Sequence, residues 1–385
     1  MSRVAPPLSL YVHMPWCVRK CPYCDFNSHG VRGTPDYAAY VEALLVDLDA
    51  DLRDFGEAVH GRAIHSVFFG GGTPSLFSPE LVHRFLDGAR ARLPFDAGAE
   101  VTLETNPGTV EHGRFDGYLA AGVNRISFGV QSFDNDKLHR LGRIHSSQEA
   151  SDAVRQAQDA GIDNINIDLM YALPEQTLDG ALDDVRRAVA LAPTHLSHYQ
   201  LTLEPNTAFA ANPPPLPDDD AAWAIQDACQ AYLADAGYGQ YEVSAYALDD
   251  RRCRHNLNYW RFGDYLGIGA GAHGKVSDAN GVRRRWKTRL PAAFLATAGE
   301  PARIGGDSVI AADDLPFEYM LNALRLVDGV PLDDFSQRTG LPLDAIAAPL
   351  AVCIRKGWLH DDPACLHTTA LGQRFLNDVI EAFMA

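Results

Sequence analysis

Strand-like and helix-like segments alternate through the first two hundred positions of this chain of 385 residues. Apolar residues recur at helical spacing over residues 36–55, and further amphipathic stretches cover residues 147–160 and 178–191. Six βα units in a row predict a parallel α/β sheet, most simply a partial (β/α)6 barrel resembling a TIM barrel. The six expected strands cover residues 8–13, 64–70, 101–104, 124–130, 165–170 and 195–201.

Polar residues cluster where these strands end. In barrels of this kind the carboxyl ends of the strands build the functional site. Those ends hold a cysteine-containing loop, the run Gly70–Pro74, Glu104, Gln131 and Asp168. We therefore expect the chemistry of this protein at that edge of the sheet.

The rest of the chain has a different pattern. A turn-rich stretch of proline and aspartate at residues 212–220 ends the alternating region. We divide the chain into a core at 1–211, a barrel-closing region at 212–310 and a small, mostly helical C-terminal domain at 311–385. The basic run from Arg283 to Arg289 could meet the carboxylates of a ligand or a partner, but we expect a solvated loop, because charge runs usually are.

Composition excludes several classes of protein. No stretch approaches the roughly 20 apolar residues of a membrane-spanning helix, and no signal-peptide pattern is present. We therefore expect a cytoplasmic protein whose seven cysteines are not in disulfides. The formal charge of −17 disfavours nucleic acid as a partner and broad attraction to anionic lipid. A homodimer is as compatible with the sequence as a monomer.

Three of the cysteines, Cys17, Cys21 and Cys24, lie within eight residues of one another. Three thiolates suit a [4Fe-4S] cubane that keeps one iron free for another ligand. A structural zinc site is the alternative, but it needs a fourth ligand, for which His29 is the nearest candidate. The spacing favours the cluster.

The motif Y-x-H-x-P-x-C-x-x-x-C-x-x-C between Tyr11 and Cys24 resembles the signature of radical S-adenosylmethionine (SAM) enzymes. The resemblance is to the coproporphyrinogen dehydrogenase-like branch and extends over nearly the whole chain. It implies that the amino and carboxylate groups of SAM bind the open iron. It also implies that one electron from the cluster cleaves SAM to methionine and a 5′-deoxyadenosyl radical.

The same resemblance implies a set of SAM contacts. A glycine run alone is equally typical of a tight turn, and a single carboxylate at a strand end is more often structural. In the family, the glycine-rich motif contacts the methionine part, the acids suit ribose hydroxyls, and the arginine suits a carboxylate. The expected SAM-binding residues are Tyr11, Gly71, Gly72, Thr73, Glu104, Gln131, Arg143 and Asp168.

A second glycine pattern, G-x-G-x-x-G at residues 269–274, formally matches the dinucleotide-binding fingerprint. That fingerprint requires a βαβ setting and an acidic residue about 20 positions later. The chain instead continues into Arg283, Arg284 and Arg285. We therefore interpret these glycines as sites of close backbone packing.

The branch contains two activities: oxygen-independent coproporphyrinogen III dehydrogenase, and heme chaperones of the HemW type. The dehydrogenases have a further cysteine two positions after the third, where this chain has Phe26. They also have a longer N-terminal extension than the stretch before residue 8. The motif H-N-x-x-Y-W at residues 255–260 is the form found in the chaperones.

This last motif suits heme chemically. His255 offers an imidazole to heme iron, Trp260 a broad face to the porphyrin, and Asn256 or Tyr259 a hydrogen bond to a propionate. If the segment is helical, His255 and Tyr259 share one face. A lone histidine is more often an ordinary core or surface residue. Cys253 is a weaker candidate for the iron ligand.

The sequence therefore predicts a heme chaperone that binds a [4Fe-4S] cluster, SAM and heme. We expect it to deliver heme to acceptor heme proteins, with respiratory ones as candidates, at the inner face of the membrane. The alternative is the dehydrogenase, which decarboxylates propionates by radical chemistry. No residue is assigned as catalytic, and the sequence leaves carrier and enzyme both open.

Overall fold

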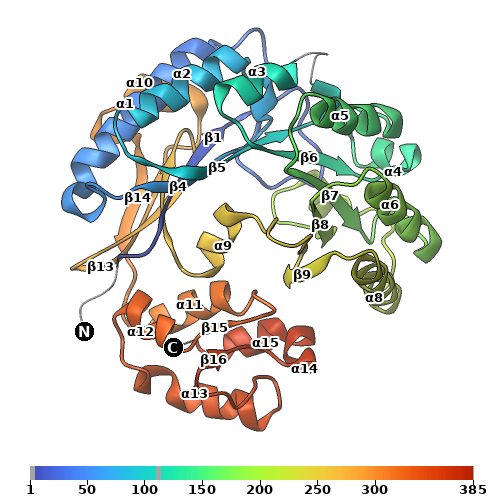
Figure 1. The fold of residues 1–385 in the computed structure, drawn as a ribbon, viewed down its shortest axis with the longest axis vertical. Coiled ribbons are helices and arrows are strands. Elements are labelled where there is room, and N and C mark those ends of the chain that lie inside the picture. The colour runs from blue at the N-terminus through green and yellow to red at the C-terminus, as the bar shows by residue number, and fades with distance from the viewer. Residues whose placement is uncertain (1–4, 110–113, 385) are drawn as a thin grey trace.

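A computed structural model describes residues 5–109 and 114–384 and contains one 12-stranded sheet. The sheet curves into an open arc in Figure 1. In spatial order its strands are β14 (Ile304–Val309), β13 (Gly281–Lys287), β12 (His273–Asp278), β11 (Asp264–Ile268), β1 (Leu8–Met14), β4 (Ile64–Gly71), β5 (Phe95–Thr105), β6 (Arg125–Gln131), β7 (Ile165–Tyr171), β8 (His195–Gln200), β10 (Ala245–Ala247) and β9 (Gly239–Glu242).

The centre of this sheet is parallel, as the sequence predicts. The six expected strands are β1 and β4 to β8, and each pairs in parallel with the next. A seventh parallel strand, β11, pairs with the other edge of β1 and was not predicted. The remaining neighbours, β10, β9 and β12 to β14, are antiparallel and extend both edges.

Amphipathic helices cover the convex face of the sheet (Figure 1). Three predicted helices are present as α1, α5 and α6, and Asp36 caps α1 by accepting a hydrogen bond from the Ala39 amide at 2.9 Å. The α-helices that the structure describes before residue 250 are α1 (Tyr37–Phe55), α2 (Pro79–Arg90), α3 (Arg114–Ala121), α4 (Asn135–Arg140), α5 (Ser147–Asp159), α6 (Leu178–Ala190), α7 (Ala208–Ala211) and α8 (Asp219–Asp235).

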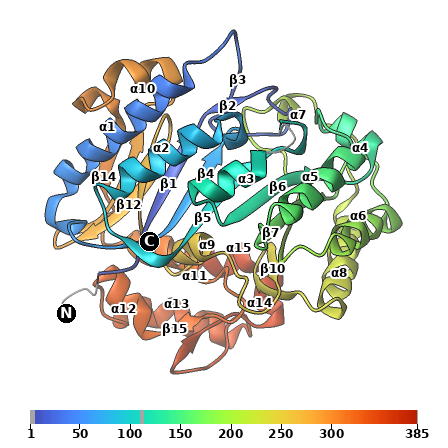
Figure 2. The ribbon, with the colours of Figure 1, turned by 45° about the horizontal axis from the view of Figure 1, so that its top comes forward.

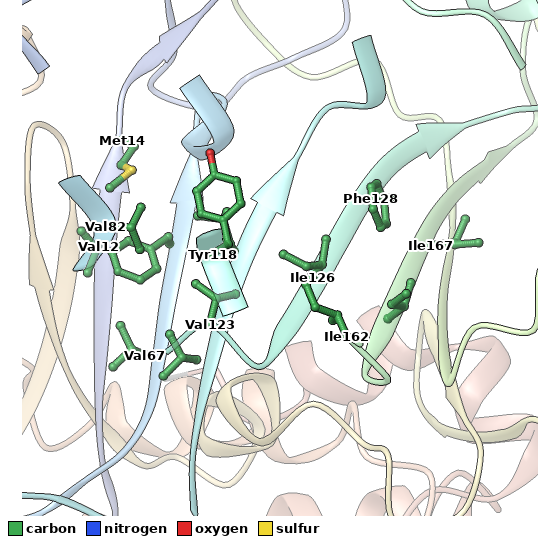
Figure 3. Packing of buried hydrophobic residues seen from close by; sticks show 14 of the residues in the cluster. Val12, Met14, Val67, Val82, Tyr118, Val123, Ile126, Phe128, Ile162 and Ile167 are labelled. Atoms are coloured by element: carbon green, nitrogen blue, oxygen red, sulfur yellow. The ribbon is translucent and has the colours of Figure 1, made fainter. Parts of the chain in front are cut away.

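Side chains alternate between the two faces of the parallel strands. In β6, Ile126 and Phe128 are buried in the main apolar core, under the outer helices (Figure 3). Their neighbours Arg125, Ser127 and Gln131 face the other way and line cavities on the concave side. The apolar face contributes the hydrophobic stabilisation of the fold, and the polar face is left for function.

The concave side of the sheet holds the short helix α9 (Arg254–Trp260), which packs on β4 and β1 (Figure 1). Below it lies a mostly helical C-terminal unit with its own apolar core (Figures 1 and 2). The remaining elements are α10 (Pro291–Thr297), α11 (Leu315–Ala323), α12 (Asp333–Thr339), α13 (Asp344–Arg355), α14 (Ala370–Arg374), α15 (Leu376–Glu381), and the small strands β2 (Trp16–Cys17), β3 (His29–Gly30), β15 (Val330–Pro331) and β16 (Cys365–Leu366).

The predicted boundary at residue 212 does not mark the end of the sheet, because β9 to β14 come from the region 212–310 and belong to it. The core of the C-terminal unit also includes Tyr241, Phe262 and Val282 from that region. The division into three parts stays a prediction. Of the helices that the structure describes, none is long and apolar enough to cross a membrane.

The basic run is not a solvated loop, so that prediction was wrong. It forms β13, whose Arg285 and Lys287 are buried. The Lys287 ammonium lies 2.6 Å from an Asp47 carboxylate oxygen and 2.8 Å from one of Asp51. These acids come from α1, so the basic strand and the acidic helix face neutralise each other inside the protein.

Candidate functional site

The cysteine loop is held against the end of β4 by backbone hydrogen bonds. Cys17 ends β2, and the Cys24 amide donates to the Cys21 carbonyl at 3.2 Å. The Gly72 amide donates to the carbonyl of Met14 at 2.8 Å, and the Thr73 amide to that of Trp16 at 2.7 Å. The glycine-rich motif therefore fixes where the first cysteine stands.

Close packing explains why two of these positions are glycine. A Cβ atom at Gly72 would lie 2.5 Å from the Trp16 carbonyl oxygen. Gly71 has φ +108°, and a Cβ there would lie 2.4 Å from the His13 ring. At Gly71 both the conformation and the space require glycine, and at Gly72 the space alone does. These contacts are with the protein itself, so contact with SAM is an additional role that stays a prediction.

A cavity of about 330 Å³ opens beside the cysteine loop. Ten of the twelve predicted site residues line it, which means that the structure brings together residues from six segments of the chain. The two exceptions are Tyr11 and His255, which line a neighbouring cavity. The ten are Cys17, Cys21, Cys24, Gly71, Gly72, Thr73, Glu104, Gln131, Arg143 and Asp168.

Arg143 links the cysteine loop to the sheet. Its guanidinium donates to the Cys21 sulfur at 3.6 Å and to the Gly129 carbonyl oxygen. Its Nε is buried and has no hydrogen-bond partner among the described residues. A buried cation beside a thiol, with one donor still free, fits an anionic group bound at this point.

Two carboxyl groups lie close together in the same cavity. Burial, with a smaller contribution from Asp168, raises the pKa of Glu104 to about 8, and the Gly71 amide donates to it at 3.2 Å. Burial also raises the pKa of Asp168, which accepts a hydrogen bond from Asn166 at 2.8 Å. Glu104 can therefore be protonated and donate a hydrogen bond, which suits it to a hydroxyl-bearing ligand.

Gln131 has a strained backbone at the end of β6. Its φ of +74° is uncommon for a residue other than glycine, and the pairing of β6 with β7 shifts register at this point. Its side chain accepts a hydrogen bond from the Tyr199 hydroxyl at 3.0 Å. Such strain is typical of functional sites.

No group of three or more histidine, cysteine or acidic side chains in residues 5–109 and 114–384 could hold a single metal ion. A mononuclear zinc site would require its thiolates to converge to about 2.3 Å from one ion. The choice between the cluster and the zinc alternative with His29 stays a prediction. The seven cysteines are all free of disulfides.

The neighbouring cavity is larger, with a volume of about 850 Å³. It lies on the concave face and shares Glu104, Asp168, Asn256 and Trp260 with the smaller one. Ligand sites in proteins commonly span roughly 300–1,000 Å³. Its wall combines aromatic rings with cations: Phe26, Phe68, Tyr259, Trp260, Tyr265 and Trp286 with Arg125, Lys275, Arg284 and Arg289.

His255 lies on α9 at the wall of this larger cavity and is only 1% exposed. Its Nε2 lies 2.8 Å from the Tyr259 hydroxyl and its Nδ1 lies 3.1 Å from the Ser66 hydroxyl. Burial lowers its pKa to about 3. The imidazole is therefore neutral, which is the metal-binding form, but both nitrogens have hydrogen-bond partners.

Sequence reasoning missed His273, at the start of β12. This histidine lines the larger cavity, and its exposed ring lies parallel to that of Trp286, at 18° with centroids 6.0 Å apart. The residue stands in the glycine-rich segment 269–274, and nothing in that segment marked its side chain as part of a site.

Gly269 and Gly271 pack closely against the protein, as expected. A Cβ atom would lie 2.5 Å from the His13 carbonyl oxygen at Gly269 and 2.2 Å from the Asn27 side chain at Gly271.

Comparison with solved structures shows the fold. The E. coli coproporphyrinogen III oxidase HemN, described as a radical SAM enzyme, superposes with a TM-score of 0.82. The match covers 98% of this chain and 90% of that one, at 23% identity. At that identity the likeness concerns the architecture alone.

Comparison of sequences shows the family. Residues 11–188 match the radical SAM superfamily, and residues 310–375 match the HemN C-terminal domain. The heme chaperone HemW of E. coli is 50% identical over 381 residues, which are 99% of both chains. The protein of the same name in Haemophilus influenzae is 48% identical over 98% of both. The chain therefore belongs to the HemW family, within the radical SAM superfamily.

Proposed function

We propose that this protein is a heme chaperone that binds a [4Fe-4S] cluster, SAM and heme and delivers heme to acceptor proteins. The observation that carries the proposal is the pair of adjoining cavities with a shared wall. One has the three cysteines, and the other is large, aromatic and lined by cations. The names of the full-length relatives support the same assignment.

In the smaller cavity, Cys17, Cys21 and Cys24 are proposed to hold the cluster, which when bound supplies one-electron chemistry. Arg143 stands next to Cys21 with an unused donor, and would bind the carboxylate of SAM. Glu104 and Asp168 would bind its ribose hydroxyls. Gly71, Gly72, Thr73 and Gln131 complete this proposed SAM site, with Tyr11 on the side of the larger cavity.

In the larger cavity, His255 is proposed to bind heme iron. Its neutral imidazole suits a metal, and ligation through Nε2 would displace the Tyr259 hydroxyl. Trp260 would then contact the porphyrin face from the same helix. Its indole Nε1 is buried without a partner among the described residues, and the Arg325 guanidinium lies over its ring at 4.3 Å.

The partner is proposed to be a heme-acceptor protein, met in the cytoplasm or at the inner face of the membrane. A formal charge of −17 disfavours direct adsorption to anionic lipid. We therefore infer that a membrane-bound acceptor would be recognised through its protein surface.

The test is an anaerobic titration of the reconstituted protein with hemin. We expect a Soret band that saturates at a fixed ratio of heme to protein, and transfer of that heme to a heme-free acceptor. A variant with all three of Cys17, Cys21 and Cys24 changed to alanine is the control for nonspecific heme binding at the cluster site. In parallel, coproporphyrinogen III is incubated with the protein, SAM and a reductant. Decarboxylation of that substrate would contradict the carrier and favour the dehydrogenase.

A further inference from the structure

Arg125 is a buried charge on the wall of the larger cavity. It begins β6 and projects to the concave side, below Ser127 on the same strand, and it is 2% exposed. Charged side chains this deeply buried are almost always paired.

Arg125 has no such pair. Its Nε is buried without a hydrogen-bond partner in residues 5–109 and 114–384, and neither a hydrogen bond nor an ion pair joins its guanidinium to any of those residues. Burial lowers the pKa of Arg125, but neighbours that include Glu100 and Asp168 act on it through space and raise the pKa above its usual value, so the guanidinium stays charged. A buried charge without a contact partner is stabilised further when a ligand supplies an anion.

The acids nearest to Arg125 already have other partners. Glu100 accepts hydrogen bonds from the amides of Arg254 and His255, each at 3.1 Å, and so caps α9. Asp168 accepts from Asn166 at 2.8 Å and from Ser127 at 3.3 Å. Both acids near Arg125 thus have hydrogen-bond donors of their own, and the guanidinium is the group that still lacks an acceptor.

We propose that Arg125 binds a carboxylate of the ligand held in the larger cavity, and that this carboxylate is a heme propionate. The step to heme rests on the proposed function. A guanidinium presents two parallel N–H donors that match a carboxylate, which makes the contact specific as well as strong. Heme carries two such groups, so one edge of the porphyrin would point toward the start of β6.

SAM offers the same chemistry through its own carboxylate. The larger cavity includes Arg125, whereas the one beside the cysteines does not and has Arg143 instead. The position of Arg125 therefore favours the propionate, and the experiment distinguishes the two sources.

The experiment compares the wild type with Arg125→Met, titrated anaerobically with hemin and with hemin dimethyl ester, in which both propionates are blocked. We expect the wild type to bind hemin at least about tenfold more tightly than the ester. Arg125→Met should lose most of this preference, and Arg125→Lys should recover part of it. SAM affinity, measured on the same samples by calorimetry, should not change.

A folding control separates ligand binding from a structural role. Arg303 is equally buried but is paired with Asp47, Asp51 and Asp54. Arg303→Met should lower the melting temperature of the ligand-free protein, because it breaks those pairs. Arg125→Met should leave it unchanged or raise it. A fall as large as that of Arg303→Met would overturn the proposal.

The other outcomes are also decisive. If the wild type binds hemin and its ester equally, Arg125 does not bind a propionate, although the chaperone function stands. If Arg125→Met loses SAM affinity instead, the carboxylate belongs to SAM. If the wild type takes up no hemin, the proposed function fails, and an unchanged SAM affinity in Arg125→Met then overturns the carboxylate site as well.

Discussion

The Nε2 atom of His255 lies 2.8 Å from the hydroxyl oxygen of Tyr259, one turn further along α9. The two rings meet edge to face, with centroids 4.8 Å apart. The four-residue spacing of the motif therefore brings the two side chains together, because residues i and i+4 of a helix share a face. The Tyr259 hydroxyl is therefore hydrogen-bonded to the nitrogen that would bind iron.

Removing that hydroxyl should make heme uptake faster. In Tyr259→Phe the aromatic ring remains, but His255 no longer has to break a hydrogen bond, worth about 1 kcal/mol, before it can bind iron. We expect hemin association to accelerate several-fold in stopped-flow absorbance measurements. His255→Ala should instead weaken hemin binding by at least about tenfold.

The matched control for this experiment is His273→Ala. His273 lines the same cavity but is exposed and stacks on Trp286. Its removal should leave the Soret maximum of the bound heme unchanged. If the maximum shifts in His273→Ala and not in His255→Ala, the iron ligand is His273 and the assignment to His255 is wrong.

Glu100 should control the stability of α9. Its carboxylate accepts from the amides of Arg254 and His255 at the start of α9, where the helix has no cap of its own. Glu100→Ala should destabilise the protein by about 1–2 kcal/mol, the usual effect of losing a helix cap. Chemical denaturation measures this value, and hydrogen exchange should show faster exchange at the amides of α9.

Glu100→Gln is an intermediate variant, because it removes the charge and one of the two acceptor oxygens. Its amide oxygen still accepts one hydrogen bond, so we expect a smaller loss of stability than in Glu100→Ala. Equal losses would mean that one remaining hydrogen bond does not stabilise the helix start without the negative charge.

The sequence predicts the parallel centre of the fold because each strand there is followed by its own amphipathic helix. Strand β11 lacks this signal: it pairs with β1, more than 250 positions earlier in the chain, and no local pattern encodes such a distant neighbour. The residues at the strand ends could be placed for the same reason as the strands, and nine of them line one cavity. Arg143, the tenth predicted residue there, follows α4 and was expected from the family resemblance alone.

Two features were missed or misread because their partners are distant. The basic run alternates, so that Arg283, Arg285 and Lys287 face the same side of a strand, although its charge alone is typical of a solvated loop. Arg125 stands beside apolar residues in a predicted strand, where a charge is unusual. Neither pattern says what the cation meets, since that depends on how α1 and the cavity are placed in three dimensions.

Breaking the buried ion pairs of β13 should cost much stability. Lys287→Met leaves Asp47 and Asp51 without the ammonium that lies within 2.8 Å of both. Removing one partner from a buried pair typically costs about 3–5 kcal/mol. Asp47 and Asp51 keep Arg303 as a partner, and Asp51 also keeps Arg285, so we expect a loss at the lower end of that range. Urea denaturation monitored by circular dichroism would measure the loss.

Arg84→Met is the comparison variant for this prediction. Arg84 of α2 pairs with Glu42 of α1 at 2.7 Å, but both side chains are about half exposed. Such surface pairs contribute roughly 0–1 kcal/mol. A loss in Lys287→Met no larger than in Arg84→Met would show that the network of β13 is not stabilising.

Acid should destabilise the protein below about pH 6.5 through its buried histidines. Burial lowers the pKa of His145 and of His198 to about 4, and that of His255 to about 3. In the unfolded chain these groups titrate near pH 6.5. Between about pH 6.5 and pH 4 the unfolded state therefore binds more protons than the folded state. The stability present above pH 6.5 is lost as the pH falls toward 4.

His198 offers the cleanest measurement of one such contribution. Its ring stacks on Tyr171 at 4.7 Å, and its Nδ1 is buried without a partner among the described residues, so His198→Phe keeps the stacking and removes the titration. Between pH 7 and pH 5 we expect the wild type to lose roughly 2 kcal/mol more than this variant in urea denaturation. His139→Asn, a change at an exposed position, should follow the wild type. Parallel pH profiles for all three proteins would show that His198 is not held neutral by burial.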